Sequence, residues 1–554
     1  MHSSEPLPHF VEHYLAYLRE ITPTYAFFDG VHTHDDLLED YSRSAIDAHL
    51  REMGSFERRL GAIYGDALTP TQKIERPIVE AHVRARIHDL EQVRGWERNP
   101  HLYADTIALS LAGQVLFNYA PAAERARRIL SKLRQVPRLL QSARDNIKDP
   151  PAIFVKTAVE TLRGVRSFID RDLPRGLAQV DDLSILGDLA DASTEAGQAI
   201  SAYADYLETE VGPKARGTFR LGKERFAAKL LLEEGIDVPP AKLLEFGTRE
   251  LAAVQEEFKA VAKKAGGKDN RDPLEIWKSF KEQHPEPGRL VETARAQVAE
   301  LEAYVRKHKI VSVPDGAPLA IAATPPFYRW TFASLWMPGP FEARPLGAHF
   351  YITEADPTWS PERQREHQRD FCHATLWSIS MHEAYPGHFL HLQHVRGVES
   401  TLRKSLLFAP MSFVEGWAHY AEHLMVEQGF ARKDPALRLG QLAESLIRLT
   451  RLIVGVRLHT EDLSVEQGVR MFRDEAYLEE SSARREAERG TFDPSYVVYA
   501  LGKLMLLKLR ADVESARGEA FSLKAFHDEL LDQGFAPFWA HRQMMLGERG
   551  VVLA

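Results

Sequence analysis

A dense run of prolines in the middle of the chain limits the fold more than any other sequence feature. Prolines recur from Pro314 to Pro345, and because proline lacks a backbone N–H and has a fixed φ, no long helix can pass through this region. The clearest strand pattern there is residues 348–353, which are rich in aromatic and β-branched side chains. We therefore expect a small irregular sheet with helices before and after it.

Helical periodicity fills the chain on both sides of this interruption. Residues 122–147 carry apolar side chains close to the helical period, with an expected kink at Pro137. A second amphipathic run follows the helix-starting Pro150-Pro151 pair. After Pro361 the helical pattern returns and lasts to about Gln543. The predicted fold class is therefore mainly α with a small β-sheet.

Length and composition exclude several classes of protein. At roughly 100–200 residues per domain, 554 residues are too many for one compact core. The net charge of −9 argues against a general nucleic-acid binder, which needs a basic surface. The N-terminal residues show no secretory signal, and no apolar stretch of about 18 residues is present to span a membrane. The single cysteine, Cys372, fits a reducing compartment. We therefore expect a soluble cytoplasmic protein without nucleic-acid or membrane partners.

The most informative segment is the pair His382-Glu383 followed by His388. In zinc hydrolases of the zincin type, two histidines of one helix hold the metal and the adjacent glutamate acts as general base. The usual spacing is four residues, which separates the two histidines by about 40° around a helix. The six-residue spacing here corresponds to about 240°, so a regular helix would point the two imidazoles apart.

Pro386 and Gly387 lie between these histidines and offer the deformation that the spacing requires. Proline cannot donate a backbone hydrogen bond and clashes with the carbonyl four residues earlier, and glycine permits backbone angles that other residues avoid. We therefore predict that the helix carrying His382 is broken or widened between Ala384 and His388. If the helix were unbroken, His391 would become the alternative ligand.

A second polar group, formed by Glu415, His419 and Glu422, has the i, i+4, i+7 spacing of one helix face. A catalytic zinc site keeps three protein ligands and an open position for water. Glu415 is the preferred third ligand, because a carboxylate offsets the charge of the metal while leaving its water acidic enough to ionise. His419 is the rival candidate.

The two segments together resemble the paired signatures of the bacterial "domain of unknown function 885" family. These signatures are His-Glu-x-x-Pro-Gly-His at 382–388 and Glu-Gly-Trp-Ala-x-Tyr-Ala-Glu at 415–422. Four further segments resemble the same family, so the likeness covers nearly the whole chain: residues 146–151, 347–357, 499–503 and 526–534. Ser495 and Arg457 depart from the family pattern, which bears more on substrate preference than on the metal site.

The family resembles gluzincin metallopeptidases, and this likeness implies a bilobal, helical, neurolysin-like architecture with the small sheet beside the active-site helix. It implies one homologous unit with an N-terminal helical lobe at residues 1–215. The C-terminal lobe, residues 216–554, would contain the sheet and the metal site. The resemblance also implies Zn²⁺ as cofactor, with the same ligands and base as the residue chemistry: His382, His388 and Glu415 as ligands and Glu383 as general base.

In the expected mechanism, zinc acidifies its bound water, and Glu383 accepts the proton as that water attacks a peptide carbonyl. The resulting oxyanion needs a further donor, for which Tyr499 is the candidate and His459 a weaker alternative. Lys503 is a possible contact for a substrate carboxylate, and the patterns do not decide whether Arg457 or His459 contacts the substrate. Cys372 is expected to be a buried small hydrophobe rather than a nucleophile.

The sequence thus predicts a zinc metallopeptidase that cleaves short peptides. One alternative is a metal-dependent amide hydrolase acting on a small non-peptide substrate, which would use the same water chemistry. The other is a helical binding or scaffold protein without catalysis, although a structural zinc site is normally closed by four protein ligands. Residue preference, exo- or endopeptidase action and oligomeric state are not encoded in these patterns.

Overall fold

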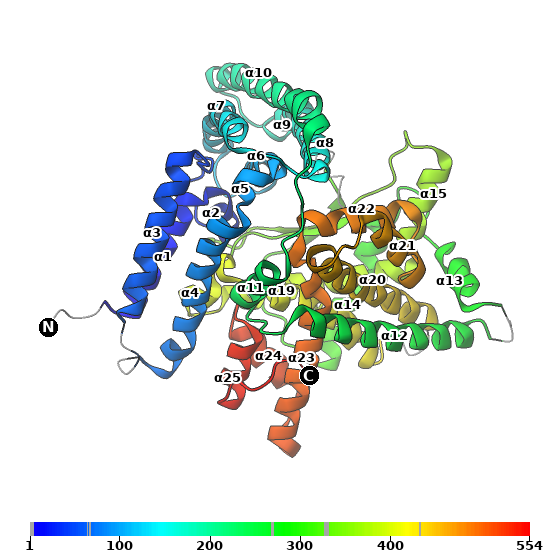
Figure 1. Ribbon diagram of the computed structural model, residues 1–554. Helices are drawn as coiled ribbons and strands as arrows, with labels where there is room; N and C mark the ends of the chain where they lie inside the picture. The colour runs from blue at the N-terminus through cyan, green and yellow to red at the C-terminus, as the bar shows by residue number, and fades with distance from the viewer. Residues whose placement is uncertain are drawn as a thin grey trace.

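The computed structural model describes residues 5–63, 65, 68–267, 271–325, 332–430 and 434–553. Helices make up most of this part of the chain, and three short strands form a small sheet (Figure 1). The predicted mainly α fold class with a small β-sheet is therefore confirmed, and the bilobal, neurolysin-like architecture stays a prediction. Residues 1–4, part of the N-terminal stretch searched for a secretory signal, lie outside the described residues. Among the described helices, none is long and apolar enough to cross a membrane.

The first helices form two groups, which lie at the left and the top of the molecule in Figure 1. α1, α3 and α4 pack around an aromatic core that includes Phe10, Tyr14 and Phe56. α6, α7, α8 and α10 share a second, mainly aliphatic core. The bounds of the N-terminal helices are α1 (Leu7–Ile21), α2 (Pro23–Asp29), α3 (Arg43–Gly61), α4 (Pro70–His88), α5 (Gly95–Arg98), α6 (Pro100–Leu116), α7 (Ala122–Asn146), α8 (Ala152–Ser167), α9 (Leu173–Gly176) and α10 (Leu183–Tyr206).

The two helices predicted from periodicity in this half are α7 and α8. α7 continues through Pro137 and ends at Asn146. α8 begins directly after Pro151 and buries the apolar stripe that the pattern indicated, including Val155, Val159 and Leu162. Both elements therefore follow local rules of periodicity and helix initiation.

The sheet has the strand order β1-β3-β2 and lies in the proline-rich region. β1 (Leu319–Ala323) pairs in parallel with the central strand β3 (Ala348–Ile352), and β2 (Ala333–Trp336) pairs antiparallel on its other side. The strand predicted at 348–353 is thus confirmed as β3. β2 also contacts α16, the helix that carries the first histidine of the metal-binding pattern. The sheet therefore lies beside that helix.

The remaining helices enclose the largest core, which extends from Leu221 to Leu553. The long helix α20 runs through it and contacts α12, α16 and α22. The bounds of these helices are α11 (Lys223–Glu234), α12 (Pro240–Ala265), α13 (Pro273–Lys281), α14 (Leu290–His308), α15 (Pro361–Asp370), α16 (His373–Glu383), α17 (His388–Arg396), α18 (Thr401–Lys404), α19 (Met411–Glu427), α20 (Pro435–Thr460), α21 (Val465–Glu475), α22 (Glu480–Phe492), α23 (Val498–Arg517), α24 (Leu523–Asp532) and α25 (Phe538–Leu546).

α19 and α23 approach each other backbone to backbone at two glycines. A Cβ atom added to Gly416 would lie 2.6 Å from the backbone of Gly502, and one added to Gly502 would lie 1.9 Å from the carbonyl oxygen of Ser412. Only glycine can occupy either position at this helix spacing, because any side chain would overlap backbone atoms.

The two lobes predicted at residues 1–215 and 216–554 stay a prediction. The fully buried residues of the mainly aliphatic core lie within residues 38–215 and those of the largest core within residues 221–553, although partly buried Val93 also packs against the largest core. The aromatic core around α1 also contains Leu402 and Phe408, so packing crosses the predicted boundary.

Candidate metal centre

The helix that carries His382 is interrupted where the sequence predicts. α16 ends at Glu383 and α17 begins at His388, so the residues between them are not helical. A Cβ atom on Gly387 would lie 1.8 Å from the carbonyl oxygen of His382, which leaves room only for glycine. The carbonyl of Pro386 accepts a hydrogen bond of 2.8 Å from the indole of Trp417 on α19. The predicted break is confirmed, and it ties the two signature segments together.

The break brings together the three residues predicted to bind metal. Nε2 of His382 lies 3.3 Å from Oε2 of Glu415, and Nε2 of His388 lies 3.4 Å from the same oxygen. The two imidazole rings are nearly perpendicular, with centroids 4.7 Å apart. One ligand atom from each of the three residues lies within 4.8 Å of the other two.

The donor set fits a divalent metal ion. Oε2 of Glu415 is buried and, in the described structure, has no hydrogen-bond partner, although an imidazole nitrogen of His382 and one of His388 lie within 3.4 Å of it. Burial opposes ionisation of Glu415, but the neighbouring His388 and His382 hold its pKa well below the usual range. Two imidazole nitrogens and one carboxylate oxygen are the ligand set of a catalytic zinc site.

Behind this cluster, Glu422 fixes the orientation of His382. Its Oε1 lies 2.8 Å from Nδ1 of His382, and its other oxygen accepts a hydrogen bond of 2.6 Å from Ser378. Glu422 is fully buried. A carboxylate on Nδ1 directs Nε2 of the same ring toward the metal position and increases its basicity. Burial lowers the pKa of His382, but the carboxylates of Glu415, Glu422 and Glu383 raise it to about 9.

Glu422 was recognised in the sequence only as part of a helical stripe. Its i+7 relation to Glu415 places it on the same face of α19, but its contact with His382 depends on how α16 packs against α19. The rival ligand His419 lies in this outer layer, with Nδ1 3.3 Å from Oε1 of Glu422. It is not part of the three-residue cluster.

Tyr499, the predicted oxyanion donor, lies on another side of the cluster. Its ring is nearly parallel to that of His382, with centroids 6.5 Å apart. Arg489 donates a hydrogen bond of 3.3 Å to the phenol oxygen. Because a guanidinium only donates, the phenol keeps its own proton for another acceptor. Burial and the charge of Glu415 raise the pKa of Tyr499 to about 12, so the hydroxyl is a donor at neutral pH.

The arginines around Tyr499 were not identified from the sequence. The guanidinium of Arg451 lies 5.0 Å from the centre of the Tyr499 ring and forms a bidentate ion pair with Glu486. Arg489 pairs with Asp493 at 2.8 Å. These contacts join α20, α22 and α23, which no local motif indicates.

Glu383, the predicted general base, is half-buried and is the last residue of α16, next to His382. His391, the ligand expected only for an unbroken helix, packs against Phe413 and Trp417 and lies outside the cluster. Cys372 is buried directly before α16, as expected.

The three weaker sequence candidates occupy different surroundings. Nε2 of His459 lies 2.8 Å from the carbonyl oxygen of Gly490. Arg457 forms an exposed ion pair of 3.0 Å with Glu461, which directly follows the end of α20. Lys503 donates to Ser445 at 3.4 Å, and burial lowers the pKa of its ammonium group to about 8.

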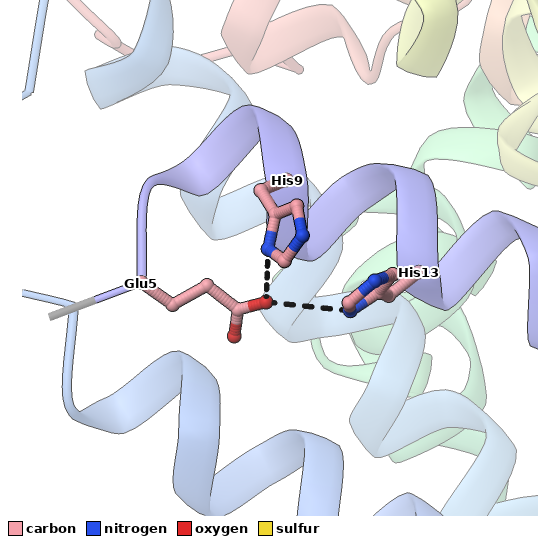
Figure 2. Close-up of side chains that lie close together, drawn as sticks. All are labelled: Glu5, His9 and His13. Carbon is pink, nitrogen blue, oxygen red and sulfur yellow. Dashed lines mark hydrogen bonds and ion pairs between the residues drawn. The ribbon is translucent and has the colours of Figure 1, made fainter.

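A second group of potential ligands lies near the N-terminus, where Glu5 approaches His9 and His13 (Figure 2). Oε1 of Glu5 lies 2.9 Å from Nδ1 of His9 and 3.5 Å from Nδ1 of His13. Arg59, however, donates to both oxygens of Glu5 and lies 3.2 Å from Nδ1 of His13. A fixed positive charge therefore already neutralises the carboxylate, and we assign no metal to this surface cluster.

Comparison with known proteins defines the family. Residues 23–544 match the model of the family described as "Bacterial protein of unknown function (DUF885)". The chain belongs to the DUF885 family. The predicted family is thus confirmed, and the match extends over both signature segments of this DUF885 protein. A comparison with curated proteins found no match.

Two solved structures share the fold of this DUF885 protein. One is "a putative lipoprotein of unknown function from Shewanella oneidensis", with a TM-score of 0.80 and 24% identity, covering 98% of this chain and 100% of that chain. The other is "the putative lipoprotein from Colwellia psychrerythraea", with a TM-score of 0.80 and 17% identity, covering 97% of this chain and 98% of that chain. Because both are described as lipoproteins, the cytoplasmic location predicted from the sequence is contradicted. The prediction was wrong because composition and a single cysteine report poorly on compartment.

Proposed function

We propose that this DUF885 protein is a zinc-dependent hydrolase of the gluzincin type that cleaves short peptides. The proposal rests on one observation, the convergence of His382, His388 and Glu415 with His382 held from behind by Glu422. A bilobal, neurolysin-like arrangement around the site belongs to the same proposal. When bound, zinc would acidify a water molecule and polarise the carbonyl of the substrate.

Two protein residues would carry out the proton transfer and the stabilisation of the oxyanion. Glu383 follows His382 at the open end of α16 and would accept a proton from the attacking water. The water oxygen bonds to the carbonyl carbon, the C–N bond breaks, and the accepted proton leaves with the amine. Tyr499 would donate its hydroxyl proton as a hydrogen bond to the carbonyl oxygen as negative charge develops there.

The deciding experiment measures metal content and peptide hydrolysis in the same preparation. We expect one zinc per chain in the wild type and cleavage of members of a short-peptide library. His388→Ala should lose both zinc and activity, whereas the matched surface variant His13→Ala should retain both. Zinc content that is unchanged in His388→Ala, or a zinc-loaded wild type that hydrolyses no peptide, would contradict the proposal.

A further inference from the structure

An exposed arginine, Arg485, lies one helical turn from the arginine that contacts Tyr499. Arg485 and Arg489 have the i, i+4 spacing of one face of α22. The side chain of Arg485 is exposed, and among the described residues no carboxylate forms an ion pair with it. Its neighbours Arg484 and Arg489, in contrast, are each paired with an acidic side chain.

The surroundings hold the Arg485 guanidinium in place without a direct ion pair, although the carboxylates of Asp370 and Glu486 lie near enough to act on its charge. It stacks over the ring of Phe332 at 4.0 Å, and it donates to the hydroxyl of Ser482 at 3.4 Å. The same hydroxyl donates to half-buried Asp370 at 2.9 Å, which fixes Ser482 as an acceptor for Arg485. An arginine whose orientation is fixed by stacking loses little conformational entropy when it binds an anion.

The position of Arg485 relates it to the candidate metal centre. Phe332 immediately precedes β2, which contacts α16, the helix of His382 and Glu383. On its other side, Arg489 connects α22 to Tyr499 and through Tyr499 to His382. Four residues along a helix span about 6 Å, which is roughly two residues of an extended peptide. A peptide extending past Tyr499 toward β2 would therefore bring its next residues to Arg485.

We infer that Arg485 binds the free C-terminal carboxylate of the peptide substrate, so that the enzyme removes short fragments from the C-terminal end. This inference rests on the proposed hydrolase function and adds the substrate class. A planar guanidinium with open N–H groups binds a carboxylate by two parallel hydrogen bonds, and an amide in the same place offers no charge to pair with it.

The test uses one cleavable peptide made in two forms, with a free C-terminal carboxylate and with a C-terminal amide. In the zinc-loaded wild type, kcat/KM for the acid should exceed that for the amide by roughly ten- to a hundredfold, the value of one charged hydrogen-bonded contact. Arg485→Met should bring this ratio close to one. The control Arg484→Met, which removes an arginine already paired with Glu466 and Glu480, should keep the wild-type ratio.

Binding of the same two peptides to zinc-loaded Glu383→Gln, measured by calorimetry, separates this inference from the proposed function. Preference for the acid without any turnover in the wild type would overturn the hydrolase proposal but keep the carboxylate contact. Turnover without preference would overturn the carboxylate contact alone. Equal losses for acid and amide in Arg485→Met, with the ratio unchanged, would also overturn it, because that result shows a structural role only.

Discussion

The described residues contain two clusters of the same composition, two histidines and one glutamate, and the charged side chain in direct contact with each cluster differs in sign. In the cluster of His382, His388 and Glu415 the side chains are 7%, 12% and 12% exposed, and a carboxylate lies behind the first imidazole. In the N-terminal cluster the two histidines are 54% and 53% exposed, and a guanidinium lies on the carboxylate. Under the proposed function, the comparison teaches that the charged groups behind the ligands, more than the ligand types, separate the proposed metal site from a surface ion pair.

The largest effect is expected on turnover, when a glutamate beside the buried cluster is substituted and compared with a glutamate of the surface cluster. Glu383→Gln should keep zinc, because Glu383 is not a ligand, but should lower turnover by roughly two to four orders of magnitude, the usual contribution of a positioned general base. Glu5→Gln should change neither quantity. The measurements are zinc content and hydrolysis rate of each variant, and full activity of Glu383→Gln would remove the proposed mechanism.

Removing the hydroxyl of Tyr499, next to the buried cluster, should have the next largest effect. Tyr499→Phe should keep zinc and lower turnover by roughly ten- to a thousandfold, because the developing oxyanion loses a donor. Since the pKa of Tyr499 is raised to about 12, its hydroxyl stays protonated from neutral pH to about pH 10. The wild-type kcat should therefore show no decline from this group in that range. Unchanged turnover in Tyr499→Phe would dismiss it as the donor.

Substituting Glu422, the carboxylate behind His382, tests the comparison of the two clusters most directly. Glu422→Gln removes the negative charge behind His382 and should reduce zinc affinity by roughly ten- to a hundredfold, measured by competition with a chelator. The three ligands themselves are unchanged. A zinc affinity equal to that of the wild type would show that the carboxylate of Glu422 does not distinguish the two clusters.

A substitution at the helix break should disturb both the fold and the site. The Cβ atom of Gly387→Ala would overlap the carbonyl of His382, so we expect a loss of stability of about 1–3 kcal/mol and a lower zinc content. Gly187→Ala is the matched control, because a Cβ atom there meets no atom within 4 Å and the helical position should gain about 0.5–1 kcal/mol. Chemical denaturation measures the free energy of unfolding of both variants. Equal stability of the two variants would contradict the expected steric conflict.

The smallest effect is expected at the surface cluster. Arg59→Met removes the guanidinium from Glu5 and should change stability by less than about 1 kcal/mol, as is usual for partly exposed ion pairs. The zinc bound at His382, His388 and Glu415 should be unaffected. A loss of zinc from the protein on this substitution would show that the N-terminal cluster takes part in metal binding.

The sequence predicted those features that depend on neighbouring residues. The helices α7 and α8, the strand β3 and the break at Pro386-Gly387 follow from periodicity, turn residues and helix geometry. The three residues of the predicted metal site are brought together, because two of them lie on either side of that break.

Contacts between distant helices could not be predicted in the same way. The acidic stripe on α19 was visible, but only the packing of α16 shows that Glu422 faces His382. The arginines on α20 and α22 reach Tyr499 from segments that share no motif with it. The cytoplasmic assignment was wrong for a different reason, because it inferred a compartment from composition, which many compartments share.

The two glycines at the contact of α19 and α23 have a consequence for how the protein could evolve. Glu415 directly precedes Gly416, and Tyr499 lies one turn before Gly502, so the backbone contact sets the gap between a ligand and the expected donor. In most helix pairs, exchanging larger and smaller side chains adjusts this gap in small steps. Here no side chain is available for exchange. Substitutions that change the substrate would therefore be expected in the residues that line the approach to the candidate metal site. The distance between Glu415 and Tyr499 would stay constant.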